Sequence, residues 1–311
     1  LYGCYDAASK GEDITEKLNA IKERYYEIIK GLGLSLSLED EFKKIDEDFR
    51  AQAGIQYAAS RGEFLNGKIM AAYLGYDFVD AATVIRFDKD GNLEAEETNK
   101  LLSKKLSKSQ HAVIPGFYGA CADGTVKTFS RGGSDVTGSL VAKAIHADIY
   151  ENWTDVSGFL VTDPRIVHNP EPIEAITYRE LRELSYMGAS VLHEDAIFPV
   201  RQAGIPINIK NTNSPEDKGT MIVEKTCHVP KYTITGIAGK KDFVAINIEK
   251  DMMNAEIGFG RKVLEAFEKY GISFEHMPSG VDTMTVIVHQ SEFEEKEQKV
   301  LTEIKHLVHP D

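Results

Sequence analysis

The sequence contains little cysteine. Cys4, Cys121 and Cys227 are the three cysteines among 311 residues, and they lie far apart with no CxxC spacing. An odd number of scattered cysteines does not form a disulfide framework, and no nearby pair of histidines completes a zinc site. The composition therefore favours a reducing, cytoplasmic setting.

Positive charge and long apolar runs are also scarce. The formal net charge is -13, with 36 Lys and Arg against 49 Asp and Glu. An acidic chain disfavours nonspecific binding to nucleic acid, so an anionic ligand must be held by local donors. No apolar run reaches the roughly 18 residues of a membrane span. From the acidic charge and the lack of such a run, we expect neither a nucleic acid nor a membrane as a partner.

Several common catalytic signatures are missing. Neither Gly67-Lys68 nor Gly239-Lys240 has the spacing and the following hydroxyl residue of a GxxxxGK[ST] loop, which disfavours a P-loop ATPase. No GxGxxG opens a βαβ unit, so a nicotinamide site is disfavoured, and neither GxSxG nor HExxH occurs. The histidines stand singly, and we expect them to serve packing or to lie at the surface.

The hydrophobic periodicity predicts alternating helices and strands. Residues 14–29 form one helical stripe, and further helices are expected at 38–59, 63–74, 93–106, 177–186 and 196–203, with strands at 78–87, 149–156 and 205–210. A break at 60–62 would place Glu63 in the first turn of a helix, where a carboxylate is favoured by the helix dipole. The recurring order predicts a layered α/β domain.

The C-terminal part has a different pattern. We expect a strand at 243–248, a helix at 258–270, strands at 272–277 and 283–288, and a closing helix at 292–307. This β-α-β-β-α order is one strand short of the split ferredoxin-like unit. The boundary between the two parts is expected near 229–233.

Residues 127–148 join a polar glycine turn to an amphipathic helix. Gly132 and Gly133 let backbone NH groups approach an anion, and a helix that begins near Ser134 or Asp135 directs its positive end at the turn. Arg131 offers a fork for a carboxylate or phosphate, and Asp135 can organise a metal or a reacting centre. This stretch therefore predicts a phosphate and carboxylate site.

Two other places are candidates for ligand binding. Thr154, Asp155, Asp163 and Arg165 follow a predicted strand, where open α/β sheets bind ligands. Residues 115–116, Pro-Gly, end another strand, and either a ligand edge or a simple turn explains them.

The segments FSRGGSDVTGSLVAKAIHAD, WTDVSGFLVTDPR, MGASVLHEDAI and INIKNTNSPEDKGT occur in this order. Over about residues 60–221 they resemble the aspartate kinases of the amino-acid kinase superfamily, and the C-terminal part resembles an ACT regulatory domain. The resemblance implies a three-layer amino-acid kinase sandwich in residues 1–229 and a ferredoxin-like βαββαβ ACT domain in 230–311. It also implies transfer of the γ-phosphoryl group of ATP, with Mg²⁺, to the side-chain carboxylate of L-aspartate. The product is 4-phospho-L-aspartate, the entry to lysine, threonine and methionine biosynthesis.

The resemblance assigns roles to the candidate residues. Arg131 would clamp a substrate carboxylate, Glu63 would hold the substrate ammonium group with Ser134 assisting, and Asp135 would organise the catalytic centre. Gly132 and Gly133 belong to the same substrate-binding turn. The nucleotide site would be lined by Thr154, Asp155, Asp163 and Arg165, and an amino-acid effector would contact Met253, Gly258, Phe259 and Asp282. No residue is assigned as a metal ligand.

The resemblance extends to partners and to missing parts. The effector is expected to be lysine, or else threonine, and pairing of ACT domains implies a homodimer or tetramer. Relatives have an N-terminal strand with a KFGG loop, a final ACT strand and a second ACT unit, so we expect the chain to omit these pieces and to be inactive alone. Leu160 and Ser190 replace an aromatic residue and a lysine that many relatives have.

Two other functions are compatible with parts of the sequence. Another amino-acid kinase, acting on acetylglutamate or a nucleoside monophosphate, is disfavoured by the ACT-like tail and the RGGSD context. A noncatalytic ACT-type amino-acid sensor is favoured only by the absence of the lysine loop.

Overall fold

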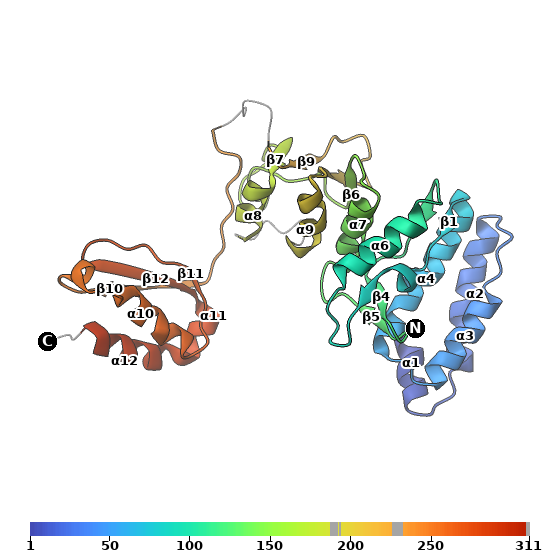
Figure 1. The fold of residues 1–311 in the computed structure, drawn as a ribbon, viewed down its shortest axis with the longest axis horizontal. Coiled ribbons are helices and arrows are strands. Elements are labelled where there is room, and N and C mark those ends of the chain that lie inside the picture. The colour runs from blue at the N-terminus through green and yellow to red at the C-terminus, as the bar shows by residue number, and fades with distance from the viewer. Residues whose placement is uncertain (187–191, 193, 226–232, 309–311) are drawn as a thin grey trace. The chain divides into compact units, whose positions relative to one another are not determined.

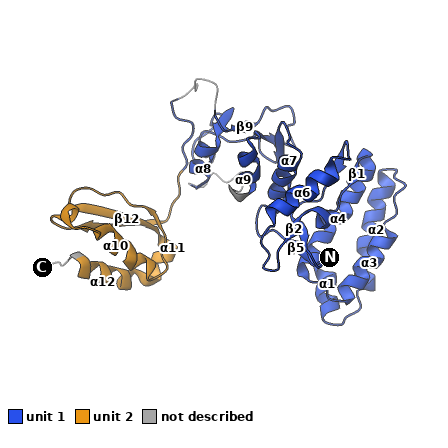
Figure 2. Cartoon of the chain, viewed as in Figure 1, with its two compact units in different colours: residues 1–238 blue, residues 239–311 orange. Residues whose placement is uncertain are grey.

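The protein divides into two compact units. The computed structural model describes residues 1–186, 192, 194–225 and 233–308. Unit 1 comprises Leu1–Ala238 and unit 2 comprises Gly239–Asp311 (Figure 2). Most of the predicted boundary at 229–233 lies outside the described residues, and the units separate a few residues later.

Unit 1 begins with a group of helices (Figure 1). They are α1 (Tyr2–Ser9), α2 (Thr15–Gly31), α3 (Glu39–Arg50) and α4 (Ile55–Leu74). Their apolar stripes meet in one core that includes Ile14, Leu38, Phe42 and Leu65. The helix predicted at 14–29 is confirmed as α2.

The predicted break at 60–62 is wrong, and so is the continuous helix at 38–59. The chain turns earlier, where Gln52 and Gly54 have φ values of 58° and 101°, so α3 ends at Arg50 and α4 begins at Ile55. A glycine inside a helix costs only about 1 kcal/mol. Burial of Arg61 against the rings of Tyr57 and Phe64, at 4.5 and 4.4 Å, favours the helix through this point. Glu63 therefore lies in the middle of α4.

The strand predicted at 78–87 is also wrong. The segment contains β1 (Asp77–Phe78), a short helix α5 (Ala81–Val84) and β2 (Arg86–Phe87). Asp80 starts the helix because its carboxylate accepts from the Ala82 NH at 3.0 Å. The same carboxylate accepts from the buried Tyr118 hydroxyl at 2.8 Å, and burial together with this charge raises the pKa of Tyr118.

The remaining strands of unit 1 that the structure describes form three sheets. β1 pairs with β3 (Ala112–Val113), and β2 pairs with β4 (Tyr118–Cys121), which makes an antiparallel hairpin with β5 (Val126–Thr128). A third sheet has the order β6 (Tyr150–Thr154), β8 (Ile207–Asn211), β9 (Thr220–Val223) and β7 (Ala175–Thr177). The accompanying helices are α6 (Ala95–Leu106), α7 (Gly133–Ala144), α8 (Tyr178–Tyr186) and α9 (Glu194–Ala203).

These elements confirm a mixed α/β class. The predicted helices at 93–106, 177–186 and 196–203 and the strands at 149–156 and 205–210 occur with small shifts at their ends. The predicted capping box of α8 is present, because the Thr177 hydroxyl accepts from the Glu180 NH at 3.2 Å and the Glu180 carboxylate accepts from the Thr177 NH at 2.9 Å. The three-layer sandwich stays a prediction.

Unit 2 is a small sheet with helices on one side. It contains β10 (Phe243–Glu249), the short helix η1 (Met253–Ala255), α10 (Phe259–Glu268), β11 (Phe274–His276), β12 (Thr283–His289), α11 (Gln290–Phe293), η2 (Glu294–Lys296) and α12 (Glu297–Val308). The antiparallel order is β10-β12-β11. The β-α-β-β-α pattern is therefore confirmed, and its alternating apolar residues form a separate core around Val263, Phe267 and Val286.

The helices bear on the question of a membrane span. Within the described ranges, none is long and apolar enough to cross a bilayer.

The core of unit 2 offers a direct test of its packing. Phe267 is 1% exposed, whereas Phe274 of the same unit is 43% exposed. Phe267→Ala should lower the free energy of unfolding by about 3–5 kcal/mol, because it deletes a buried ring and leaves a cavity. Urea unfolding followed by far-UV circular dichroism measures this loss. Phe274→Ala is the matched control, and equal losses in the two variants would contradict the burial of Phe267 in the core.

Candidate active site

The N-terminal end of α7 opens onto the glycine turn, as the sequence predicts. Gly132 is the N-cap with a left-handed φ of 55°, and the helix begins at Gly133. The first-turn NH groups of a helix have no partner within the helix, and they carry a partial positive charge. The turn therefore has the geometry of an anion-binding site.

Close packing holds this helix end against the β4–β5 hairpin. A Cβ at Gly133 would lie 2.7 Å from the Cβ of Phe117 and 2.9 Å from that of Phe129, so only glycine fits there. The Thr137 hydroxyl accepts from the Phe117 NH at 3.1 Å and donates to the Gly133 carbonyl at 2.8 Å. These contacts fix the direction of α7 relative to the hairpin.

Residues 115–116 belong to the same neighbourhood, and α4 packs against it. A Cβ at Gly116 would lie 3.0 Å from the Cα of Ser134, and one at Gly67 would lie 2.9 Å from Pro115. Gln56 at the start of α4 accepts from the Thr128 NH at 3.0 Å. Glu63 lies seven residues after Gln56 and four before Gly67, so the three positions share the face of α4 that meets these segments. Glu63 is exposed there.

The candidate substrate residues differ in how they are held. Arg131 and Ser134 are exposed, and their side chains have no ion pair or hydrogen bond within the part of the chain that the structure describes. Asp135 is half-buried, and its Oδ1 accepts from the Asn152 amide at 2.8 Å. Two side chains are thus free to meet a ligand, and a third is fixed beside them.

Thr154 and Asp155 lie at the carboxyl end of β6, next to the carboxyl end of β8. Thr154 pairs in register with Asn211, and its carbonyl accepts from the NH and hydroxyl of Thr212 at 2.8 and 2.9 Å. Ser157 bonds Asp217 and Asn211 at 2.5 and 3.0 Å. The sheet edge is therefore a polar, hydrogen-bonded rim.

Asp163 and Arg165 are tied to each other. Arg165 Nε lies 3.0 Å from both Asp163 oxygens, and its Nη2 lies 2.6 Å from Oδ2. The hydrogen bond from Arg165 lowers the pKa of Asp163. Among the described residues, no hydrogen bond or ion pair joins this pair to Thr154 or Asp155, so the four predicted nucleotide-site residues fall into two separately bonded pairs.

Two of the four effector candidates in unit 2 are buried, and the other two, Gly258 and Asp282, are exposed. Met253 and Phe259 are 5% and 2% exposed and belong to the core. Gly258 caps α10 with φ 81°, and the Asp282 carbonyl accepts from the Lys250 NH at 2.9 Å. Beside them, Glu256 bonds Lys250 and Lys262, which lower the pKa of Glu256 to about 2.

Sequence reasoning missed several residues that shape the site. Asn152 and Tyr150 of β6 and Gln56 of α4 were not singled out. The one available signal was an asparagine inside a strand, at a position where the alternation calls for an apolar residue.

Ser190 and His193 lie outside the described residues. Within the described ranges, no group of three His, Cys, Asp or Glu side chains could hold a metal ion.

Comparison with known proteins relates this arrangement to a family. The model of the amino acid kinase family matches residues 10–211. Aspartokinase 3 of Bacillus subtilis is 39% identical over 100% of this chain and 72% of its own length. Chloroplastic aspartokinase 1 of Arabidopsis thaliana is 29% identical over 94% of this chain and 55% of its own length.

Solved structures lead to the same family. The crystal structure of Clostridium acetobutylicum aspartate kinase is 50% identical, covers 100% of this chain and 72% of its own, and superposes with a TM-score of 0.86. Escherichia coli aspartokinase III in complex with aspartate and ADP shares the fold at 23% identity and a TM-score of 0.65, with 98% and 74% of the two chains covered. The chain therefore belongs to the amino acid kinase family and, within it, to the aspartokinases.

Proposed function

We propose that this chain transfers the γ-phosphoryl group of ATP to the side-chain carboxylate of L-aspartate. The product is 4-phospho-L-aspartate, and the reaction is the first step of lysine, threonine and methionine biosynthesis. Residues 1–229 form the catalytic domain in this proposal, and 230–311 form an ACT regulatory domain. A cytoplasmic location and assembly as a homodimer or tetramer belong to the same proposal.

The arrangement at the start of α7 carries the proposal. Among the described residues, Arg131 and Ser134 have no side-chain partner at this helix N-terminus, and they lie beside an Asp135 that hydrogen-bonds Asn152. Phosphoryl transfer requires positioning and charge neutralisation more than covalent chemistry by the protein. Arg131 binds the carboxylate of aspartate as a bidentate partner, Glu63 binds its ammonium group, and Ser134 and the amides of Gly132 and Gly133 complete the substrate site.

Thr154 and Asp155 bind the nucleotide at the carboxyl end of β6. Asp163 and Arg165 join them once their mutual ion pair opens toward ATP. Nucleotide-bound Mg²⁺ would take most of its ligands from phosphates and water, so it would need no group of protein carboxylates. When bound, Mg²⁺ neutralises charge on the transferring phosphate.

The first test is the choice of substrate. An assay that couples ADP release to a colour change should detect turnover of the full-length protein with L-aspartate and none with N-acetylglutamate. Absence of aspartate-dependent ADP release would remove the proposed reaction, and turnover with N-acetylglutamate alone would favour a different amino-acid kinase.

Arg131 provides a test of the substrate site. Arg131→Ala should raise the KM for aspartate roughly 10- to 150-fold, because a hydrogen bond to a charged group contributes about 1.5–3 kcal/mol. The KM for ATP should stay near its original value. Arg24, which is exposed on α2 and paired with Glu27, supplies the matched control as Arg24→Ala. Unchanged aspartate kinetics in Arg131→Ala would exclude this residue from the site.

The regulatory part of the proposal can be tested by calorimetry. Lysine, or else threonine, should bind to the full-length protein, and Asp282→Asn should weaken that binding by about tenfold because it removes a charge beside the effector. Asp251→Asn is the control, since Asp251 is also exposed and was not assigned to the effector site. Binding of neither amino acid would count against regulation through unit 2.

A further inference from the structure

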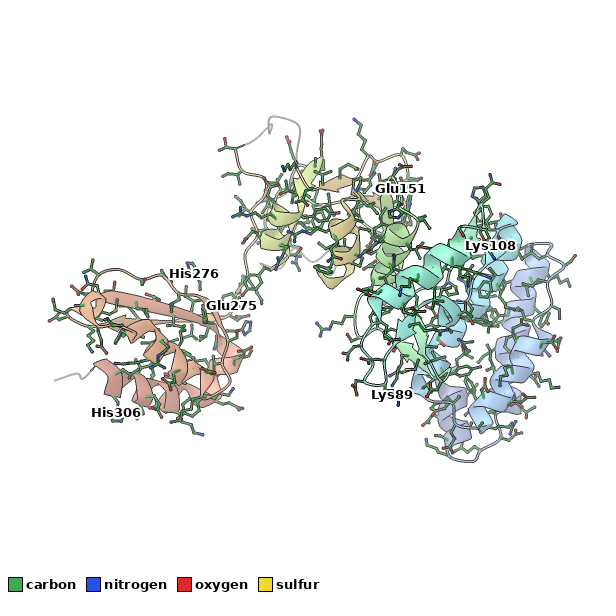
Figure 3. The ribbon with its side chains drawn as sticks, viewed as in Figure 1. Lys89, Lys108, Glu151, Glu275, His276 and His306 are labelled. Atoms are coloured by element: carbon green, nitrogen blue, oxygen red, sulfur yellow. The ribbon has the colours of Figure 1, made fainter. Side chains whose placement is uncertain are left out.

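Strand β6 buries the polar side chain of Asn152 at the position where the neighbouring strand β8 buries an isoleucine, Ile209. Asn152 is 9% exposed, whereas Glu151, labelled in Figure 3, and Trp153 are exposed and hydrogen-bond each other at 3.2 Å. Alternation along a strand places Tyr150, Asn152 and Thr154 on the opposite face from that pair. A buried amide is costly unless its hydrogen-bonding groups are satisfied, so its partners are informative.

The amide of Asn152 donates to two groups. Its nitrogen lies 2.8 Å from Oδ1 of Asp135 and 3.1 Å from the Tyr150 hydroxyl. The Tyr150 hydroxyl in turn donates to the Asp135 carbonyl at 3.3 Å. Because a carboxylate only accepts, the orientation of the Asn152 amide is determined by its partner.

Close packing makes this cluster rigid. A Cβ at Gly138 of α7 would lie 2.6 Å from the Tyr150 hydroxyl, so the helix rests directly on the strand. On the other side, Gly133 rests on Phe117 and Phe129. These contacts on both sides of α7 hold its first turn in place, so the Asp135 carboxylate stays within hydrogen-bonding distance of the Asn152 amide.

We propose that Asn152 is a positioning residue for the phosphoryl-transfer site, holding the Asp135 carboxylate in its reactive orientation. The proposal rests on the proposed function, which places Asp135 at the catalytic centre. Thr154 follows Asn152 by two residues on the same face of β6. The same strand therefore positions both the Asp135 carboxylate and the start of the proposed nucleotide site. Asparagine suits this task because its amide donates a hydrogen bond without carrying a charge.

Two substitutions distinguish an Asn152 that orients the Asp135 carboxylate from an Asn152 that only fills space. Asn152→Leu keeps the size and removes the donor, so kcat should fall about 10- to 100-fold, as expected for the loss of a hydrogen bond to a charged group, with little change in the KM for ATP. Asn152→Asp places a second carboxylate against the first. The pair then shares a proton at low pH and repels when both groups ionise.

The pH profile is the readout that a purely structural role would not produce. Asn152→Asp should keep much of its kcat near pH 6, where the shared proton replaces the amide donor, and lose activity as the pH rises. The original protein should show no such loss over that range, and Asn152→Leu should be slow throughout.

Arg131 precedes Asp135 by four residues, and Tyr150 is the other titratable side chain in contact with the cluster in the described part of the chain. Burial raises the pKa of Tyr150, so its hydroxyl stays protonated through the assay.

Asn208→Leu is the matched control. Asn208 lies on the neighbouring strand β8, and its side-chain oxygen is buried without a partner among the described residues. This variant should keep the original kcat and pH profile. Thermal melting of each variant monitors folding, and Tyr150→Phe, which removes only a hydroxyl, gives a milder perturbation of the same cluster with a smaller fall in kcat.

The outcomes separate this inference from the proposed function. If the original protein shows no aspartate-dependent turnover, the proposed function itself fails. If it turns over aspartate, then a folded Asn152→Leu variant with unchanged kcat, or an Asn152→Asp variant with an unaltered pH profile, would overturn the role of Asn152 alone.

Discussion

The close approach of α7 to its neighbours is the constraint on which the candidate site depends. On one side the backbone of Gly133 touches the β4–β5 hairpin, and on the other Gly138 touches Tyr150 of β6. Any larger side chain at either glycine would separate the layers. The helix end, with the NH groups of its first turn, is therefore held at a fixed place between the segment that carries Arg131 and the strand that carries Thr154.

Charge is distributed in a way that suits an acidic protein with an anionic ligand. The net charge of -13 does not attract phosphate, so binding must come from local donors. Many exposed cations are engaged with carboxylates, as Arg165 is with Asp163 and Lys262 is with Glu256. Arg131 is left unpaired in the described residues at the mouth of α7, where an approaching carboxylate would meet both the guanidinium and the helix dipole.

Prediction from the sequence succeeded where local signals agreed and failed where a tertiary contact outweighed them. The long amphipathic stripes of α2 and α6 and the capping box of α8 needed only local information. Residues 60–62 resembled a break, but burial of Arg61 among aromatic rings keeps them helical. Residues 78–87 resembled a strand, but Asp80 caps a helix while bonding Tyr118, which lies 38 residues later. Neither partner could be known from the local pattern.

The sequence by itself determined the alternating α/β order, the β-α-β-β-α pattern of unit 2, the helix that follows the glycine turn, and the resemblance that led to the aspartokinases. Each of these depends on periodicity or on motifs that are continuous in the chain. Only the tertiary structure placed Glu63 on the face of α4 that meets Pro115 and Thr128. It also brought Asn152 to Asp135 across 17 residues, whereas Asp163 and Arg165 satisfied each other. The partner of a polar side chain is decided by which elements come to lie side by side, and that depends on packing across the whole unit.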